Sequence, residues 1–73
     1  MIHVMPLYFI EARVTRRHQS ISTLAQEVVG HLVNANDDNE AMTKFKDAVK
    51  KKYDHEPVVG MSYELLHFAT VIK

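Results

Sequence analysis

Residues 11–23, EARVTRRHQSIST, contain the point at which the hydrophobic pattern of the chain changes. Up to the middle of this stretch, every second residue from Tyr8 to Val14 is apolar, which is typical of a strand with one buried face. Beyond it, apolar residues recur at three- and four-residue spacing, which is typical of an amphipathic helix. The pattern therefore predicts a strand over residues 7–16 that leads into a helix over residues 20–33.

The predicted helix over residues 20–33 has a polar first turn and an apolar stripe. Ser20 or Ser22 can accept a hydrogen bond from the unpaired N–H groups of that turn. Gly30 weakens the last turns by up to about 1 kcal/mol relative to alanine, and the polar run that follows ends the helix. The stripe consists of Ile21, Leu24, Ala25, Val28, Val29 and Leu32.

A second helix is predicted to begin at a capping box of Asp37 and Glu40, whose side chains can satisfy each other's backbone N–H groups. It ends before Pro57, because proline disfavours helical geometry in the residue that precedes it. Its apolar stripe consists of Ala41, Met42, Phe45, Ala48, Val49 and Tyr53. Residues 58–72 are rich in strand-forming residues that alternate at first with polar ones, so we expect a second strand there.

Two helices joined by a short turn return the chain to the end of the sheet that it left, so the two strands are expected to run antiparallel. The sequence therefore predicts an α+β fold of β-α-α-β order, with antiparallel strands and a helical hairpin on one face. The start of the first strand then lies beside the end of the last, where both faces are apolar. We expect five side chains to gather there on the face opposite the helices: Leu7, Phe9, Leu66, Phe68 and Ile72.

This apolar patch predicts an interface, because monomeric proteins rarely leave such a patch unused. Together with two unprotected sheet edges, it favours a homodimer or a tightly bound protein partner, held through the sheet face or through an edge. The alternative is that the last residues fold back, or form a further strand, and cover the patch within one chain.

The chain has 73 residues and no cysteine, so we expect a single domain over residues 1–73 without disulfides. A domain of this size buries only about 60% of the surface of its unfolded chain, which makes a partner a useful source of further burial. No stretch approaches the roughly 20 apolar residues of a membrane span, and the start lacks a secretory signal pattern. We therefore expect a cytoplasmic protein that begins at its own start methionine.

The basic residues near the end of the first strand and the end of the second helix form a candidate binding site. Lysine and arginine in one patch bind the phosphates of nucleic acid without sequence preference, and the residues concerned are Arg16, Arg17, Lys50, Lys51 and Lys52. The formal net charge of the chain is zero, however, and nearby acidic residues neutralise the local field. We favour a solvent-exposed corner, with a nucleic-acid site as the alternative.

No pattern in the sequence indicates catalysis, a cofactor or a metal. The five histidines are scattered, and only His55, beside Asp54 and Glu56, has other potential ligands next to it; a charged loop explains that run better. The serines lack the setting of an activated nucleophile, and two glycines cannot build a phosphate-binding loop. We expect a non-enzymatic protein-binding modulator, and the alternative is a nucleic-acid-binding regulator that uses the basic corner.

The strand PLYFIEARVTR and the run EAMTKFKDAVKKKYDHEPVVGMSYE together resemble small accessory proteins of bacteriophages and other mobile elements. In those proteins a strand, a helix with an Ala-x3-Phe-x3-Val-x3-Tyr stripe and a closing strand make up nearly the whole chain. Here the stripe is Ala41, Phe45, Val49 and Tyr53. The resemblance implies a protein of the host cytoplasm that binds and modifies a host component, such as a defence system, a polymerase or a nuclease. The helix predicted over residues 20–33 departs from that outline and leaves the sheet order open.

Overall fold

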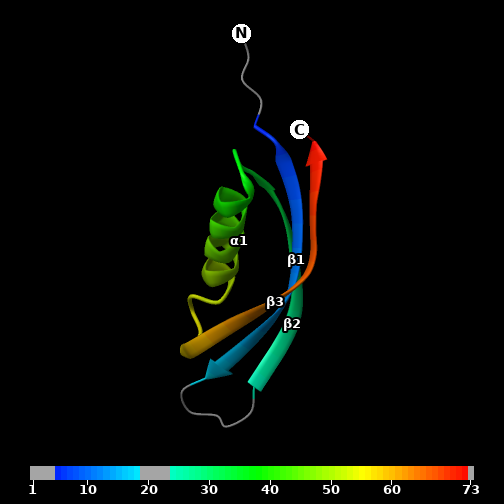
Figure 1. Ribbon diagram of the computed structural model, residues 1–73. Helices are drawn as coiled ribbons and strands as arrows, with labels where there is room; N and C mark the ends of the chain where they lie inside the picture. The colour runs from blue at the N-terminus through cyan, green and yellow to red at the C-terminus, as the bar shows by residue number, and fades with distance from the viewer. Residues whose placement is uncertain (1–4, 19–23, 73) are drawn as a thin grey trace.

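The computed structural model describes residues 5–18 and 24–72, which form one three-stranded antiparallel sheet and one helix (Figure 1). In chain order the elements are β1 (Leu7–His18), β2 (Leu24–Asn34), α1 (Asp38–Lys52) and β3 (Val58–Ile72). The predicted α+β class is confirmed, but the two-helix hairpin is wrong, because the segment predicted as the first helix is strand β2. The start of that predicted helix, residues 20–23, lies outside the described residues.

Strand β2 pairs antiparallel with β1 along its whole length. The four-residue spacing of Leu24, Val28 and Leu32 fits a helix, but it also fits a strand, because four is a multiple of the two-residue strand repeat. The adjacent Val28 and Val29 are β-branched and favour a strand, and Gly30 disfavours a helix. Strand pairing therefore prevails over helical periodicity in this segment.

Strand β3 lies on the other side of β1, so the sheet order is β2-β1-β3. It runs antiparallel to β1, and Leu7 pairs with Ile72, which confirms that the start of the first strand lies beside the end of the last. The register shifts at three places, and each shift leaves one residue of β3 without a partner in β1: Val71, Leu66 and Val59. Such bulges bend a strand and change the direction of its side chains.

The core lies between α1 and one face of the sheet, which we call the helix face. Helix α1 packs across β1 and β2, and alternate residues of β1 point toward it, as strand geometry requires. All four residues of the Ala-x3-Phe-x3-Val-x3-Tyr stripe are buried here. The core consists of Tyr8, Ile10, Ala12, Val14, Val29, Ala35, Ala41, Phe45, Val49 and Tyr53.

Helix α1 begins as predicted, because Asp37 is its N-cap and accepts a hydrogen bond of 2.8 Å from the N–H of Glu40. The Glu40 carboxylate accepts in turn from the N–H of Asn36, one residue earlier than a capping box requires. Three lysines occupy the last turn, where positive charge opposes the negative end of the helix dipole. A helix of the length and apolarity that a bilayer crossing requires does not occur among the described residues.

The opposite side of the sheet, which we call the open face, is covered by no other element among the described residues (Figure 1). Here the ring of Phe9 lies over Gly30: a Cβ at Gly30 would be 3.3 Å from two atoms of that ring. The ring centroid of His67 is 5.9 Å from that of Phe9. An aromatic side chain thus shields the bare backbone of a strand glycine, an arrangement that helps to hold neighbouring strands in register.

Candidate functional site

Arg16 and Arg17 point to opposite faces of the sheet, so they do not form one basic patch. Successive residues of a strand alternate between faces. Arg16 pairs in register with Met61, which packs against the core, whereas Arg17 pairs with Gly60 on the open face. Arg16 is half-buried and Arg17 is exposed. The two arginines therefore have different roles.

Arg16 belongs to a polar cluster at the C-terminal end of α1, which consists of Arg16, His18, Glu27, Lys52, Tyr53 and Glu56. Its guanidinium carbon lies 3.9 Å from the centroid of the Tyr53 ring, in a cation–π arrangement. Its Nη1 lies 3.4 Å from both carboxylate oxygens of Glu56, and only 13% of its side chain is exposed. Arg16 therefore joins β1 to the segment that follows α1.

His18 shares the Glu56 carboxylate with Arg16, since its Nε2 lies 2.8 Å from Glu56 Oε2. The hydrogen bond from His18 and the charge of Arg16 hold the pKa of Glu56 below its ordinary value of 4.5, against the effect of burial. Glu56, which stands beside Asp54 and His55 in the sequence, thus directs its carboxylate toward β1. No group of three potential metal ligands occurs within the described ranges.

Glu27 of β2 is the second carboxylate of the polar cluster. It accepts a hydrogen bond from the hydroxyl of Tyr53, and its Oε2 lies 3.1 Å from Nζ of Lys52. These hydrogen bonds, that of Tyr53 first, hold the pKa of Glu27 below its ordinary value. Burial, reinforced by Glu27, raises the pKa of Tyr53 to about 12. The cluster therefore ties α1 to both β1 and β2.

The polar cluster predicts that stability falls at both ends of the pH range. Because Glu27 and Glu56 have lowered pKa values in the folded state, their contribution is present above about pH 4.5 and is lost as the pH falls through the folded values. The contribution of Tyr53 is lost as the pH rises from 10.0 toward 12. Urea unfolding across this range measures both losses. Glu27→Gln combined with Glu56→Gln should reduce the acid loss, and an unchanged acid loss would contradict the assignment.

The three lysines of the last turn of α1 also differ in their contacts. All three side chains are exposed, but Lys52 forms an ion pair with Glu27, whereas Lys50 and Lys51 form none with the described residues. Arg17 lies on the other side of the sheet, away from all three. The five residues that the sequence grouped as a basic corner therefore do not share one surface, and the half of the corner around Arg16 and Lys52 is part of the fold.

Alanine at Arg16 should destabilise the protein by about 2 kcal/mol, because it removes a cation–π contact and one hydrogen-bonding partner of Glu56. Alanine at Arg17 should change stability by less than about 0.5 kcal/mol, as is usual for an exposed side chain. The two variants remove the same side chain from adjacent positions and differ in the face of the sheet that they affect. Urea unfolding measures the difference, and equal losses would contradict the register of β1.

The open face has an apolar end, formed where β1 begins and where β2 and β3 end. Leu32 is 62% exposed and Val28 is 53% exposed, although both are large apolar side chains. Residues that pair across neighbouring strands share a face. The register therefore assigns five residues to this apolar end: Leu7, Phe9, Leu32, Ala69 and Ile72. Val28 lies on the same face further along β2, opposite Arg13.

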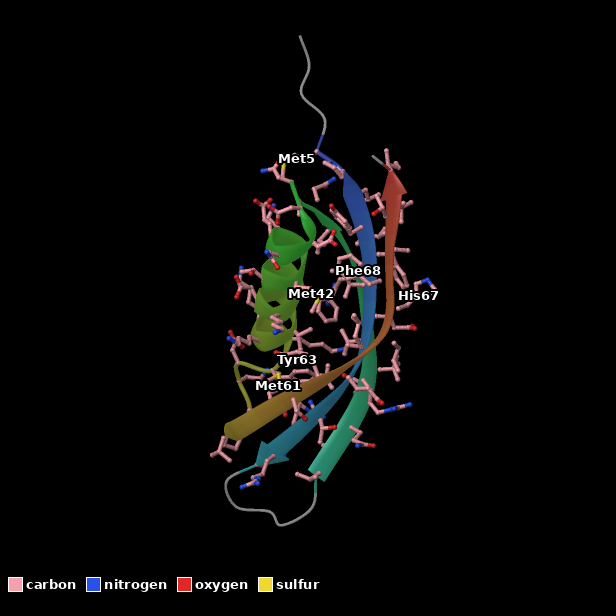
Figure 2. The ribbon with its side chains drawn as sticks, in the orientation of Figure 1. Met5, Met42, Met61, Tyr63, His67 and Phe68 are labelled. Carbon is pink, nitrogen blue, oxygen red and sulfur yellow. The ribbon has the colours of Figure 1, made fainter. Side chains whose placement is uncertain are left out.

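Of the five residues predicted as an interface, three lie in the apolar end: Leu7, Phe9 and Ile72. Phe68 lies on the helix face instead, where its ring centroid is 5.6 Å from that of Tyr8, and Figure 2 shows it on the opposite side of β3 from His67. Leu66 is a bulge residue without a partner in β1. The placement expected for Phe68 is therefore wrong, because bulges interrupt the alternation along β3.

Val28 and Leu32 lie on the open face, Leu32 within its apolar end, although the sequence pattern predicts a helix for both. Had residues 24–34 been assigned to a strand, even-numbered positions would have shown Leu24, Val28 and Leu32 on one face. The sequence thus contains the strand pattern, but the same spacing of apolar residues also fits a helix.

The rest of the open face is mainly polar, although the exposed side chains of Leu24 and Val28 also lie on it. Arg13 of β1 forms an ion pair with Glu64 of β3, and Gln26 of β2 donates a hydrogen bond of 3.2 Å to Thr15. Together with Glu11 and Arg17, this face carries two acidic and two basic side chains, whose formal charges cancel. The open face is therefore apolar at one end and mainly polar, without net charge, at the other.

Within ranges 5–18 and 24–72, these features define a small α+β protein in which one helix covers one face of a three-stranded sheet. No protein-family model, no curated protein and no solved structure matches the chain. The function is therefore argued from the surfaces of the protein itself, since a fold alone does not determine function.

Proposed function

We propose that this protein is a non-enzymatic protein-binding modulator that dimerises through the apolar end of its open face and binds a further protein. The observation that carries the proposal is the position of that end: apolar side chains from all three strands lie together on the side of the sheet opposite the core. A contiguous apolar patch on a small protein usually marks an interface.

A second copy of the chain fits the open face for two reasons. The four charges of the face, Glu11, Arg13, Arg17 and Glu64, cancel, so two copies can approach without net repulsion. Two sheets can also pack face to face, about 10 Å apart, when the side chains of their inner faces interdigitate. This pairing would cover both apolar ends and supplement the small core of a 73-residue chain.

The polar cluster supports a role without catalysis. Glu56 is held by Arg16 and His18, and Glu27 is held by Tyr53 and Lys52. Both carboxylates are thus paired with neighbouring side chains, so they stabilise the junction of α1 with the sheet and do not present an unpaired acid or base to a substrate. We therefore assign the function to binding surfaces.

The resemblance to accessory proteins of bacteriophages makes a host protein the candidate for the further partner, whose activity the binding would alter. The alternative is a nucleic-acid-binding regulator. It would depend on Arg17, Lys50 and Lys51, which lie on separate surfaces, because Arg16 and Lys52 are engaged in the polar cluster. We favour the protein partner for this reason.

Affinity capture from a lysate of the host cell, with and without nuclease, separates the two functions. The tagged native chain should retain one protein at stoichiometric yield, and this yield should survive both nuclease and raised salt. Nucleic acid in the retained fraction, or proteins that disappear after nuclease treatment, would contradict the proposal. Binding that weakens steeply with salt would do so too, because phosphate contacts are lost in that way.

A further inference from the structure

The start of β3 has a hollow on each face of the sheet. Both hollows are lined by residues 59–61 of this strand. The hollow on the open face has a volume of about 310 Å³ and is completed by Thr15, Arg17, Leu24 and Ser62. The hollow on the helix face has a volume of about 340 Å³. Its lining includes Lys50 at the end of α1, and Tyr53 and Glu56 just after the helix. A short stretch of strand is thus accessible from both sides.

Gly60 contributes no side chain to the hollow on the open face. Its φ is not positive, and a Cβ built there would meet no atom within 4 Å. Neither the backbone nor the packing requires glycine, although glycine weakens the interior of a strand. Such a glycine often marks a place where a ligand or another backbone approaches closely. The neighbouring Val59 is a bulge residue, and bulges are frequent beside functional sites.

The same stretch lies on a free edge, because β3 is an outer strand of the described sheet. The N–H and C=O groups on the outer side of an edge strand can pair with another extended segment. Side chains of an added strand alternate between the two faces, so those opposite residues 59–61 would enter the two hollows in turn. Backbone pairing then supplies affinity and the hollows supply specificity, as in other cases of peptide recognition by strand addition.

Arg17 determines which side chain suits the hollow on the open face. It is the cross-strand neighbour of Gly60, it is exposed, and it forms no ion pair with an acidic residue of ranges 5–18 and 24–72. An added strand would lie about 10 Å from β1, which is two strand spacings. An arginine and a glutamate can span this distance together, because no side chain stands at Gly60. The hydroxyls of Thr15 and Ser62 line the same hollow, and such donors match a carboxylate.

We infer that the start of β3 is a strand-addition site, at which an extended segment of a partner protein pairs with residues 59–61 and places an acidic side chain beside Arg17. The inference rests on the proposed function, because it gives the further partner of the dimer a mode of binding. Arg17 and Gly60 lie at the opposite end of the strands from Leu7 and Ile72. A dimer formed through the apolar end therefore leaves this site free.

Selection from a library of random twelve-residue peptides displayed on phage, with the native chain as bait, tests the inference. Enriched peptides should share an aspartate or glutamate within an alternating sequence rich in β-branched residues. One enriched peptide is then synthesised and titrated against native protein and variants by fluorescence anisotropy. Arg17→Gln should weaken binding about tenfold, because it removes a charge-assisted contact. Gly60→Val should weaken it at least as much, because its side chain would stand between the free edge and Arg17.

Two controls separate lost binding from lost folding. Gly60→Val places a strand-favouring residue where space is available, so its thermal unfolding should match or exceed that of the native chain. Lys51→Gln removes a charge from the exposed side of α1 and should leave the affinity unchanged. In amide spectra recorded by nuclear magnetic resonance, the signals of residues 59–61 should move most when the peptide is added.

Enriched peptides without an acidic residue would overturn the inference, as would equal affinity for the native chain, Arg17→Gln and Gly60→Val. A library that yields no binder would overturn it too. Peptides that move the signals of Phe9 and Leu32 instead would overturn the strand-addition site but keep the open face as a binding surface. The proposed function is tested separately, by measuring the molar mass of the native chain in the absence of peptide.

Discussion

Replacing Phe45 with alanine should destabilise this protein by about 3–5 kcal/mol. The Phe45 side chain is fully buried between α1 and the sheet, where its ring lies edge-on to His31, with 5.9 Å between the ring centroids. Truncating a buried phenylalanine typically costs about 3–5 kcal/mol, because the transfer of the ring from water is lost and a cavity remains. Domains of this size have a total stability of about 4–11 kcal/mol. One substitution thus removes a large part of it.

Urea unfolding followed by circular dichroism measures this loss, with Thr43→Ala as the matched control. Thr43 lies on the exposed side of the same helix, so alanine there should change stability by less than about 0.5 kcal/mol. A loss below about 1 kcal/mol for Phe45→Ala would contradict the position of α1 on the sheet.

Two segments of this chain repeat apolar residues every four positions, yet one is a helix and the other is a strand. Phe45 and Val49 show this spacing in α1, and Val28 and Leu32 show it in β2. Because a spacing of four fits both periods, the neighbouring residues decide between them. The capping-box pattern of Asp37 and Glu40, together with two alanines and five lysines, made α1 predictable. The valines of β2 and its Gly30 favour a strand over a helix, but the spacing of the apolar residues indicated a helix.

The antiparallel pairing of β1 with β3 could be predicted, although the path that produces it could not. The expectation rested on two helices between the strands. In the structure, β1 first pairs with β2, and α1 then crosses from β2 to the free side of β1. In either path the chain reverses direction an odd number of times between β1 and β3. Both paths therefore give antiparallel pairing of these two strands. Sequence periodicity alone does not separate them.

Sequence periodicity is equally limited in placing the single residues of the candidate site. The predicted strand ended at residue 16, so Arg16 and Arg17 were treated as one corner. In the structure β1 continues to His18, and simple alternation then separates the two arginines. The position of Phe68 was beyond prediction, because it depends on bulges that leave no clear mark in the sequence.

Leu32→Lys should convert the proposed dimer to a monomer without unfolding it. Leu32 is the most exposed large apolar side chain of the apolar end, so in a dimer it would lie at the interface. A lysine there would bring a charge into an apolar contact and should raise the dissociation constant about a hundredfold or more. The stability of each chain should change by less than about 0.5 kcal/mol, since the substituted side chain does not touch the core.

Gln26→Lys is the matched control for Leu32→Lys. Gln26 is exposed on the same face of the same strand but lies toward the polar end. The substitution adds the same charge to β2, so it should leave self-association nearly unchanged. If both variants weakened self-association equally, general charge repulsion would explain the effect and the apolar end would not be the interface.

In the proposed dimer, a second copy covers the apolar end of the open face. Sedimentation equilibrium of the native chain over a range of concentrations measures this association. We expect a molar mass that rises with concentration to twice the 8.4 kDa of one chain. A mass that stays at 8.4 kDa at every concentration would contradict it.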